Sequence, residues 1–300
     1  MKVIIDIGVL FVLVIMMVAV GMDLEGQHFR EVSRRKWVVV LTIACQMVVL
    51  PALGLLLIYF MRMPPHLSAG ILLLAACPVG DIANLYTLLA QANVALSVTL
   101  NTLSCLLSVV TMAVIFKAYD LLMREHFVFA VPTPTLVVRL TLMVVLPVLS
   151  GMIIRRYKPA FVARYRKAVQ NISIGGIAYL LVYTMLTQRE QLARDWLQTA
   201  VAGAVFMVAA ILCGLAFSRL LRLTTRDGVT VGIAFAVRNV GLALAIAVTL
   251  LNRIEFAIFA VVYFIAEVPL LLGGVTVFRR WWVRGVVPAE VTSISETAVE

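Results

Sequence analysis

The chain of 300 residues is 63% hydrophobic and only 13% charged, and its mean hydropathy is +1.06. A soluble globular domain carries about 25% charged residues, so this composition excludes a soluble protein and indicates an all-α polytopic membrane protein. The formal net charge of +10 would also suit a nucleic-acid-binding protein, but the placement of the basic residues argues against that partner.

Nine apolar stretches are each long enough to cross a bilayer as a helix, which takes about 20 residues. They fall near residues 3–21, 37–60, 67–90, 94–117, 134–154, 168–187, 197–220, 228–251 and 254–277. Together they predict a transmembrane domain over residues 1–284. The polar residues 285–300 are expected to form a disordered tail.

Lys and Arg residues concentrate in alternate connections between these stretches. Sixteen of the 25 lie in the first, fifth and seventh connections and in the tail, whereas seven lie on the opposite side. Short cytoplasmic loops carry an excess of basic residues. The sequence therefore predicts an integral inner or plasma membrane protein with its N-terminus outside and its C-terminus in the cytoplasm, and no nucleic-acid partner.

Two short motifs interrupt the third and the eighth stretch with helix-breaking or polar residues. They are Cys77-Pro-Val-Gly-Asp-Ile-Ala-Asn84 and Ala234-Phe-Ala-Val-Arg-Asn-Val-Gly241. No water satisfies free backbone groups at that depth, so a broken helix is tolerated only where it is buried in protein or lines a cavity. Paired breaks in corresponding halves of a membrane protein indicate the central binding site of a transporter. As an alternative, Pro78 and Gly80 would merely kink a packed helix.

The breaks also relate the two halves of the chain. Residues 1–118 and 166–277 each hold four stretches, and the third stretch of each half is the broken one. One half begins outside and the other inside, which predicts inverted repeats with an unpaired helix at about 134–154. The two broken helices would then cross near the membrane midplane.

A crossing of broken helices can hold an organic anion, because the free N–H groups of half-helix N-termini carry partial positive charge. The candidate substrate contacts are Asp81, Ile82, Ala83, Arg238, Asn239, Asn171 and Glu267. Structural roles stay open for two of them. Asn171 would equally bond a neighbouring helix, and Glu267 would equally bond Tyr263 or the backbone.

Several short motifs are distributed over nearly the whole chain: Gly21-Met-Asp-Leu24, Gln46, Cys77-Pro78, Asn84, Asn93-Val-Ala-Leu-Ser-Val98 and Arg238-Asn-Val-Gly-Leu-Ala-Leu244. In this combination the chain resembles the bile acid:sodium symporter (BASS) family. The resemblance implies a panel domain, a core domain with two crossed helices, and alternating-access transport of organic anions, either bile-acid-like or small carboxylates. Many members have ten spans, and this chain lacks the first of them.

Sodium-coupled members hold two Na⁺ ions behind the crossing. The resemblance assigns the corresponding positions to Gln46, Ala83, Asn84, Ser97, Asn101, Ala234 and Arg238. Ala234 stands where a Glu usually bridges both ions, and Arg238 stands where a Gln is usual. Unit charges ~4 Å apart interact by about 4 kcal/mol at an effective dielectric near 20, so replacing attraction with repulsion disfavours sodium at the second site. The first site stays open, because Asn84, Ser97 and Asn101 still offer oxygens.

A buried charge at Arg238 requires a partner. Asp81 in the other motif is the hypothesised partner across the crossing; alternatively, Asp81 caps its own half-helix by accepting backbone N–H groups. Protons would be another coupling ion, since intramembrane carboxylates commonly act as proton relays. Glu267, which has no obvious partner, is the better candidate for that role.

The sequence thus favours a secondary transporter of organic anions that is independent of sodium, with the substrate and the lipid bilayer as its partners. A sodium- or proton-coupled symporter and a non-transporting membrane sensor of the same fold are the alternatives. An enzyme is not expected, and neither is a cofactor or a metal centre, because the four Cys residues lie within the apolar stretches without metal-ligand spacing.

Overall fold

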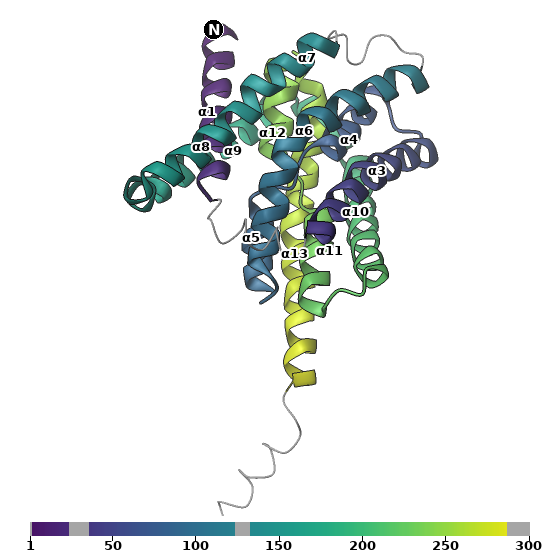
Figure 1. The fold of residues 1–300 in the computed structure, drawn as a ribbon. Helices are drawn as coiled ribbons and strands as arrows, with labels where there is room; N and C mark the ends of the chain where they lie inside the picture. The colour runs from purple at the N-terminus through teal and green to yellow at the C-terminus, as the bar shows by residue number, and fades with distance from the viewer. Residues whose placement is uncertain (1, 24–35, 124–132, 287–300) are drawn as a thin grey trace, which may run out of the picture.

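The computed structural model describes residues 2–23, 36–123 and 133–286, and within these ranges the chain is helical with no strand. The helices group into nine segments that coincide with the nine apolar stretches (Figure 1). In chain order these are α1 (Lys2–Asp23); α3 (Lys36–Met61); α4 (Pro65–Ala76) with α5 (Ile82–Leu89); α6 (Val94–Met123); α7 (Thr133–Leu140) with the π-helix η1 (Thr141–Val145) and α8 (Leu146–Tyr157); α9 (Pro159–Thr187); α10 (Arg189–Leu220); α11 (Thr225–Ala236) with α12 (Val240–Ala245) and the π-helix η2 (Ile246–Leu250); and the 3₁₀-helix η3 (Ile254–Phe256) with α13 (Ala257–Val286).

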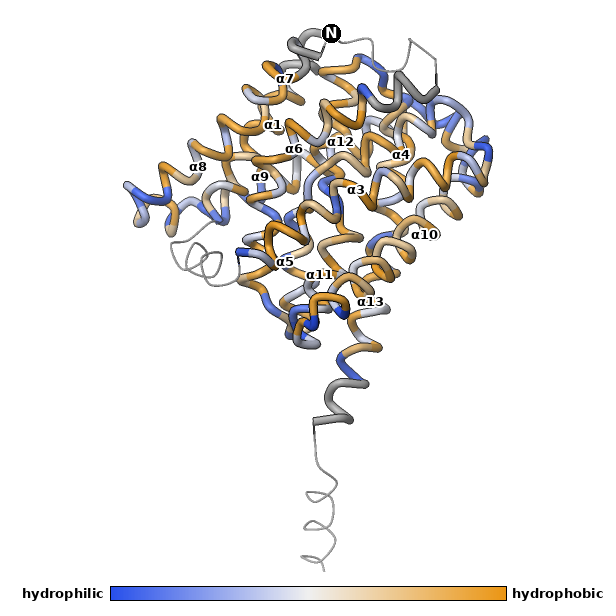
Figure 2. Tube along the Cα trace, turned by 45° about the vertical axis from the view of Figure 1, so that its right-hand side comes forward, coloured by the Kyte–Doolittle hydropathy of each residue, from blue (hydrophilic) through white to orange (hydrophobic). Residues whose placement is uncertain are grey.

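The surface of this helical body is apolar. Large hydrophobic side chains such as Val48, Tyr59 and Leu197 are 70–77% exposed, and hydrophobic residues run along most of each helix while polar residues gather near helix ends (Figure 2). Six described helices are long and apolar enough to cross a membrane, and shorter apolar helices lie between them. Exposed apolar surface on this scale is stable only against lipid or protein. The prediction of an all-α integral membrane protein is confirmed.

Three segments form one group of helices. α1 packs most extensively against α8 and α9 (Figure 1). Its contact with α8 depends on small residues: a Cβ added to Gly21 would lie 3.0 Å from the Cα of Gly151. Glycine lets two membrane helices approach until their backbones touch. This group corresponds to the panel domain that the resemblance implies.

The remaining segments form the second group, which contains α3, α6, α10, α13 and both broken helices. Its largest fully buried side chains are aromatic: Tyr86, Tyr263, Phe206, Phe235 and Phe259. α10 packs along α11 and α13, and α6 contacts both broken helices. This group corresponds to the core domain. The inverted relation between the two halves stays a prediction.

The two breaks meet each other inside the core group. The N–H of Gly80 donates to the carbonyl of Val237 at 3.1 Å, and the N–H of Asn239 donates to the carbonyl of Pro78 at 2.9 Å. Val79 and Arg238 thereby form an isolated antiparallel β-bridge. Each unwound segment thus satisfies backbone groups of the other, as a break at membrane depth requires.

Helices α9 and α10 begin earlier than the apolar stretches predict, at Pro159 and Arg189. The first turns of each helix include basic residues, Arg164 and Arg166 in α9 and Arg189 and Arg194 in α10, so the span prediction missed them. The predicted basic connection between the fifth and sixth stretches is only the turn at Lys158. Of the tail predicted at residues 285–300, Gly285 and Val286 are still helical at the end of α13, and residues 287–300 lie outside the described ranges.

Among the described residues, four non-glycine residues adopt positive φ, and all follow a helix end: Arg62 after α3, Gln91 after α5, Arg222 after α10 and Asn252 after η2. A left-handed residue is a common helix terminator. The four positions are the ends of the second and third stretches in each half of the chain. This correspondence supports the inverted-repeat prediction.

Candidate transport site

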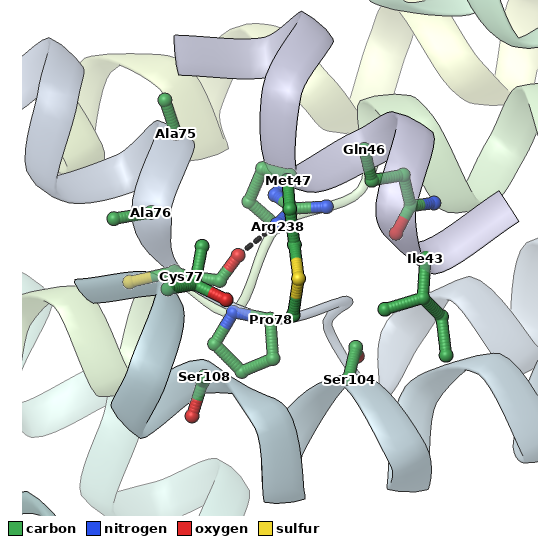
Figure 3. A pocket seen from close by; sticks show the side chains of 11 residues that line it. Ile43, Gln46, Met47, Ala75, Ala76, Cys77, Pro78, Ser104, Ser108 and Arg238 are labelled. Atoms are coloured by element: carbon green, nitrogen blue, oxygen red, sulfur yellow. Dashed lines mark hydrogen bonds between the residues drawn. The ribbon is translucent and has the colours of Figure 1, made fainter. Parts of the chain in front are cut away.

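Arg238 lies in the crossing and is only 5% exposed. One terminal nitrogen of its guanidinium donates to the carbonyl of Cys77 (Figure 3), and the other contacts the carbonyl of Ala234 at 3.5 Å. Cys77 is the C-terminal cap of α4, and Ala234 lies in the last turn of α11. The terminal carbonyls of a helix have no intrahelical donor and carry partial negative charge. Arg238 therefore places a positive charge at the C-terminal ends of both half-helices.

A small pocket adjoins Arg238 on the side of α3 and α6 (Figure 3). It is lined by Ile43, Gln46, Met47, Ala75, Ala76, Cys77, Pro78, Ser104, Ser108, Thr111 and Arg238. Gln46 is buried, and its amide nitrogen has no hydrogen-bond partner within the described residues. Gln46, Ala234 and Arg238, three positions that the resemblance assigns to sodium ligands, thus lie together. The positive charge among these three residues is the guanidinium of Arg238, which is part of the protein and not a bound ion.

The hypothesised ion pair between Asp81 and Arg238 is not formed. Asp81 Oδ1 accepts a hydrogen bond of 2.6 Å from the amide of Asn101, whereas Arg238 uses backbone carbonyls. Asp81 occupies the N-cap position of α5, but its side chain accepts no bond from the helix, so the capping alternative is wrong as well. The two charges sit on unwound segments that pair through their backbones, and the side chains reach different helices.

The positions of the first sodium site lie on facing sides of α5 and α6. Ser97 donates to Asn84 Oδ1 at 2.8 Å, one helical turn from the contact between Asn101 and Asp81. Ala83, the remaining position, is fully buried. Four polar side chains are therefore gathered here, and in this state they are bonded in two pairs.

Asn239 is the N-cap of α12. Its side-chain oxygen accepts the N–H of Leu242 at 2.9 Å, while its amide nitrogen is buried without a partner among the described residues. At the start of α5, the N–H of Ala83 is bonded to Gly80. No hydrogen bond is assigned to the N–H groups of Asp81 and Ile82 within the described chain. Free donors thus remain at both half-helix N-termini.

The two remaining candidates differ in position. Asn171 is an exposed residue of α9 that does not belong to the buried stripe of that helix. Glu267 on α13 is fully buried, and neither carboxylate oxygen has a partner in the described residues. Tyr263, its expected partner, donates to the carbonyl of Ala236 instead.

Two residues of the crossing were missed by the sequence analysis. Ser104 accepts the N–H of Val79 at 3.1 Å and donates to the carbonyl of Asn101, and Tyr263 bonds the last carbonyl of α11. Ser104 had a signal in the sequence: with Ser97 and Asn101 it follows a spacing of four and then three residues, which marks one face of α6. Tyr263 had none.

Crossed half-helices with free donors, buried within the core group, define the class of secondary transporters with discontinuous helices. Residues 10–195 match the family described as Sodium Bile acid symporter family. That match covers more than half of the chain, so the chain belongs to this family. Its named members are transporters and not enzymes.

Individual relatives extend the likeness. The chain is 26% identical over 250 residues to the uncharacterized sodium-dependent transporter YocS of Bacillus subtilis, which covers 82% of this chain and 76% of YocS. It is 27% identical to the probable chloroplastic sodium/metabolite cotransporter BASS1 of Arabidopsis thaliana, over 78% of this chain and 57% of that protein. Human sodium/bile acid cotransporter 4 is 29% identical over 66% of this chain and 44% of its own length.

Proposed function

We propose that this transporter moves organic anions by alternating access without binding sodium at the second site. One observation carries the proposal: the guanidinium of Arg238 bonds carbonyls at the C-terminal ends of α4 and α11, at positions that the resemblance assigns to sodium ligands. Such carbonyl ends attract a cation. Arg238 supplies one that cannot dissociate.

The energetic consequence for sodium is large. A sodium ion ~4 Å from the guanidinium would be repelled by about 4 kcal/mol at an effective dielectric near 20, which corresponds to roughly a thousand-fold loss of affinity. Ala234 is fully buried and offers no carboxylate to offset this repulsion. At the second site, the guanidinium of Arg238 would therefore take the place of an exchangeable sodium ion.

A second candidate function is coupling to one sodium ion at the first site. The relatives favour it, because YocS and BASS1 are named as sodium-dependent and sodium/metabolite transporters, and Asn84, Ser97 and Asn101 bear suitable oxygens. Against it, the pairs Ser97–Asn84 and Asn101–Asp81 are already hydrogen-bonded at 2.8 and 2.6 Å. An ion would have to replace both bonds.

The substrate contacts would come from two kinds of donor: the N–H groups of Asp81 and Ile82, which make no backbone hydrogen bond among the described residues, and the unpartnered side-chain amide of Asn239. These groups suit a carboxylate or another small anionic group. The carboxylate of Asp81 lies beside them and would repel such a group. We therefore expect Asp81→Asn to tighten the binding of an anionic probe, which would appear as a lower KM for uptake.

The deciding experiment is uptake by the full-length chain in proteoliposomes, with labelled taurocholate and lactate as a large and a small organic anion. Uptake by the unaltered protein should be equal in NaCl and choline chloride, whereas Ala234→Glu/Arg238→Gln should respond to a sodium gradient. Arg253→Gln, which removes an exposed arginine paired with Glu255, is the matched control. Sodium-dependent uptake by the unaltered protein would establish the second candidate. Binding of a probe without any flux would establish the sensor alternative.

The orientation in the membrane belongs to the same proposal. The excess of Lys and Arg in alternate connections supports an N-terminus outside and a C-terminus in the cytoplasm. A fluorescent protein that matures only in the cytoplasm, fused to the C-terminus, should therefore fluoresce in cells. A dark fusion that is present in the membrane at normal levels would contradict the orientation.

A further inference from the structure

Glu267 on α13 is an acidic side chain whose burial is not balanced by any bond. It is 0% exposed, and both carboxylate oxygens lack a hydrogen-bond partner in the described part of the chain. The other buried carboxylate of the site, Asp81, is bonded to Asn101. An ionised carboxylate without a partner is not tolerated in a membrane interior. In this state Glu267 is therefore a neutral carboxyl that holds a proton.

Within the described ranges, Glu267 forms no ion pair and no hydrogen bond through its carboxyl group. The titratable groups within electrostatic reach are Tyr86 on α5 and Tyr263 on α13. α12 has no titratable residue, and the only one on α4, His66, bonds Asp195 at the first turn of that helix. The buried faces of α9 and α10 carry none.

A proton is the cation that fits this site. A metal ion takes several oxygen ligands, and no cluster of three or more His, Cys, Asp or Glu suited to a metal occurs in the described residues. The two carboxylate oxygens are also closed to solvent. A proton needs neither a cavity nor a ligand shell, so the closed site can hold one.

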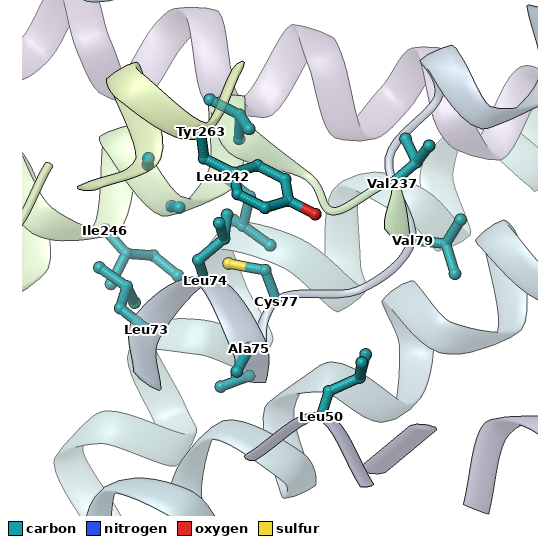
Figure 4. Close-up of a cluster of buried hydrophobic side chains, with 14 of the residues drawn as sticks. Leu50, Leu73, Leu74, Ala75, Cys77, Val79, Val237, Leu242, Ile246 and Tyr263 are labelled. Carbon is teal, nitrogen blue, oxygen red and sulfur yellow. The ribbon is translucent and has the colours of Figure 1, made fainter. Parts of the chain in front are cut away.

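Glu267 is also connected to the crossing. Tyr263 lies one helical turn earlier on the same face of α13, and its hydroxyl donates to the carbonyl of Ala236, the last residue of α11, at 2.5 Å. Figure 4 shows this hydroxyl pointing toward the unwound segment that contains Val237. Pro269, two residues after Glu267, cannot donate the helical bond to Ile265, which weakens α13 locally.

α13 further contacts α9 of the panel as well as α4 and α12 of the core. A movement of panel against core would therefore alter the surroundings of Glu267. We propose that Glu267 is the proton-binding site that couples the transport cycle to a proton gradient. One carboxyl oxygen carries the proton in the state described; when the site opens to water, the O–H bond breaks, the proton leaves to water and a carboxylate remains. This inference rests on the proposed transport function and supplies its coupling ion.

Proton binding can be tested without knowing the substrate. Proteoliposomes of the full-length chain on a solid-supported membrane should give a transient current after a pH jump, as the buried site gains or loses a proton. Glu267→Gln should reduce this current at least fivefold. Glu255→Gln, a partly exposed carboxyl in an ion pair with Arg253, should leave it unchanged. An equal current in Glu267→Gln, or no current in the unaltered protein, would overturn the inference.

Coupling is then measured as the ratio of accumulation driven by an inward proton gradient to exchange at equal pH, with taurocholate or lactate as the probe. We expect this ratio to fall at least tenfold in Glu267→Gln and to persist in Glu267→Asp, which keeps the carboxyl. A ratio unchanged in Glu267→Gln would refute the role. Probe uptake without a pH-jump current overturns this inference alone, whereas a current without uptake of any probe overturns the proposed transport function.

Discussion

Arg238→Met removes the guanidinium from the crossing and keeps an apolar stem of similar length. The carbonyls of Cys77 and Ala234 then lose their side-chain donor. A buried acceptor without a partner costs about 1–3 kcal/mol, so two of them cost about 2–6 kcal/mol. The variant also avoids the desolvation cost of burying the guanidinium, so the expected net loss in the free energy of unfolding is about 2–4 kcal/mol.

The measurement is the apparent melting temperature of the detergent-purified chain, with all variants heated at one rate because unfolding of such proteins is commonly irreversible. Arg238→Lys should lose less than Arg238→Met, since an ammonium keeps the charge but not the planar fork of donors. Arg253→Met removes a guanidinium whose side chain is 48% exposed and should change stability by less than about 0.5 kcal/mol.

The more specific test is whether sodium changes the melting temperature of each variant. In Ala234→Glu/Arg238→Gln, sodium at a hundred times its dissociation constant would add about 2.7 kcal/mol of stability, visible as a higher melting temperature in NaCl than in choline chloride. Arg238→Met alone should melt alike in both salts. If Arg238→Met melted like the unaltered protein, the guanidinium would not be holding the half-helices. If sodium raised the melting temperature of Arg238→Met without the Ala234→Glu change, the argument that sodium needs a carboxylate at position 234 would be refuted.

Three further substitutions test the crossing and the helix ends through the same melting assay. Gly80→Ala should cost about 1–3 kcal/mol and reduce uptake, because its Cβ would lie 2.7 Å from the carbonyl of Arg238; normal stability would mean that the breaks do not pack this closely. Tyr263→Phe should cost about 1–2 kcal/mol, since the carbonyl of Ala236 loses its donor; no loss would mean that another donor replaces it. Gln91→Gly should stabilise by about 0.5–1 kcal/mol at its φ of 54°; destabilisation would argue against that turn.

The segments could be predicted from sequence because the bilayer restricts the solutions. A spanning helix needs about 20 apolar residues, and free backbone groups are not tolerated at that depth. The same restriction made the breaks visible: Pro78 and Gly80 mark the first, and the polar pair Arg238 and Asn239 marks the second. The helix ends at Pro159 and Arg189 were missed because basic turns continue a helix without contributing apolar character.

The side-chain partners at the crossing could not be predicted in this way. Asp81 and Arg238 are opposite charges on corresponding breaks, so the sequence suggested an ion pair. The antiparallel bridge between Val79 and Arg238 pairs the backbones instead. Asp81 then reaches α6, and Arg238 reaches the end of α4. A sequence records which charges occur but not the direction in which an unwound segment presents them.

Arg238 and Glu267 are both ionisable residues inside the membrane, but they have different capacities. Arg238 is attached to the chain and bonds the carbonyl ends of both half-helices, so it can stabilise the crossing but cannot leave it. An ion couples transport to a gradient only if it binds on one side and dissociates on the other. Under the proposed function, a fixed guanidinium would replace the structural role of sodium and give up its coupling role. Glu267, buried with both oxygens unpartnered, is a group that can still change its charge, and coupling would then pass to the proton.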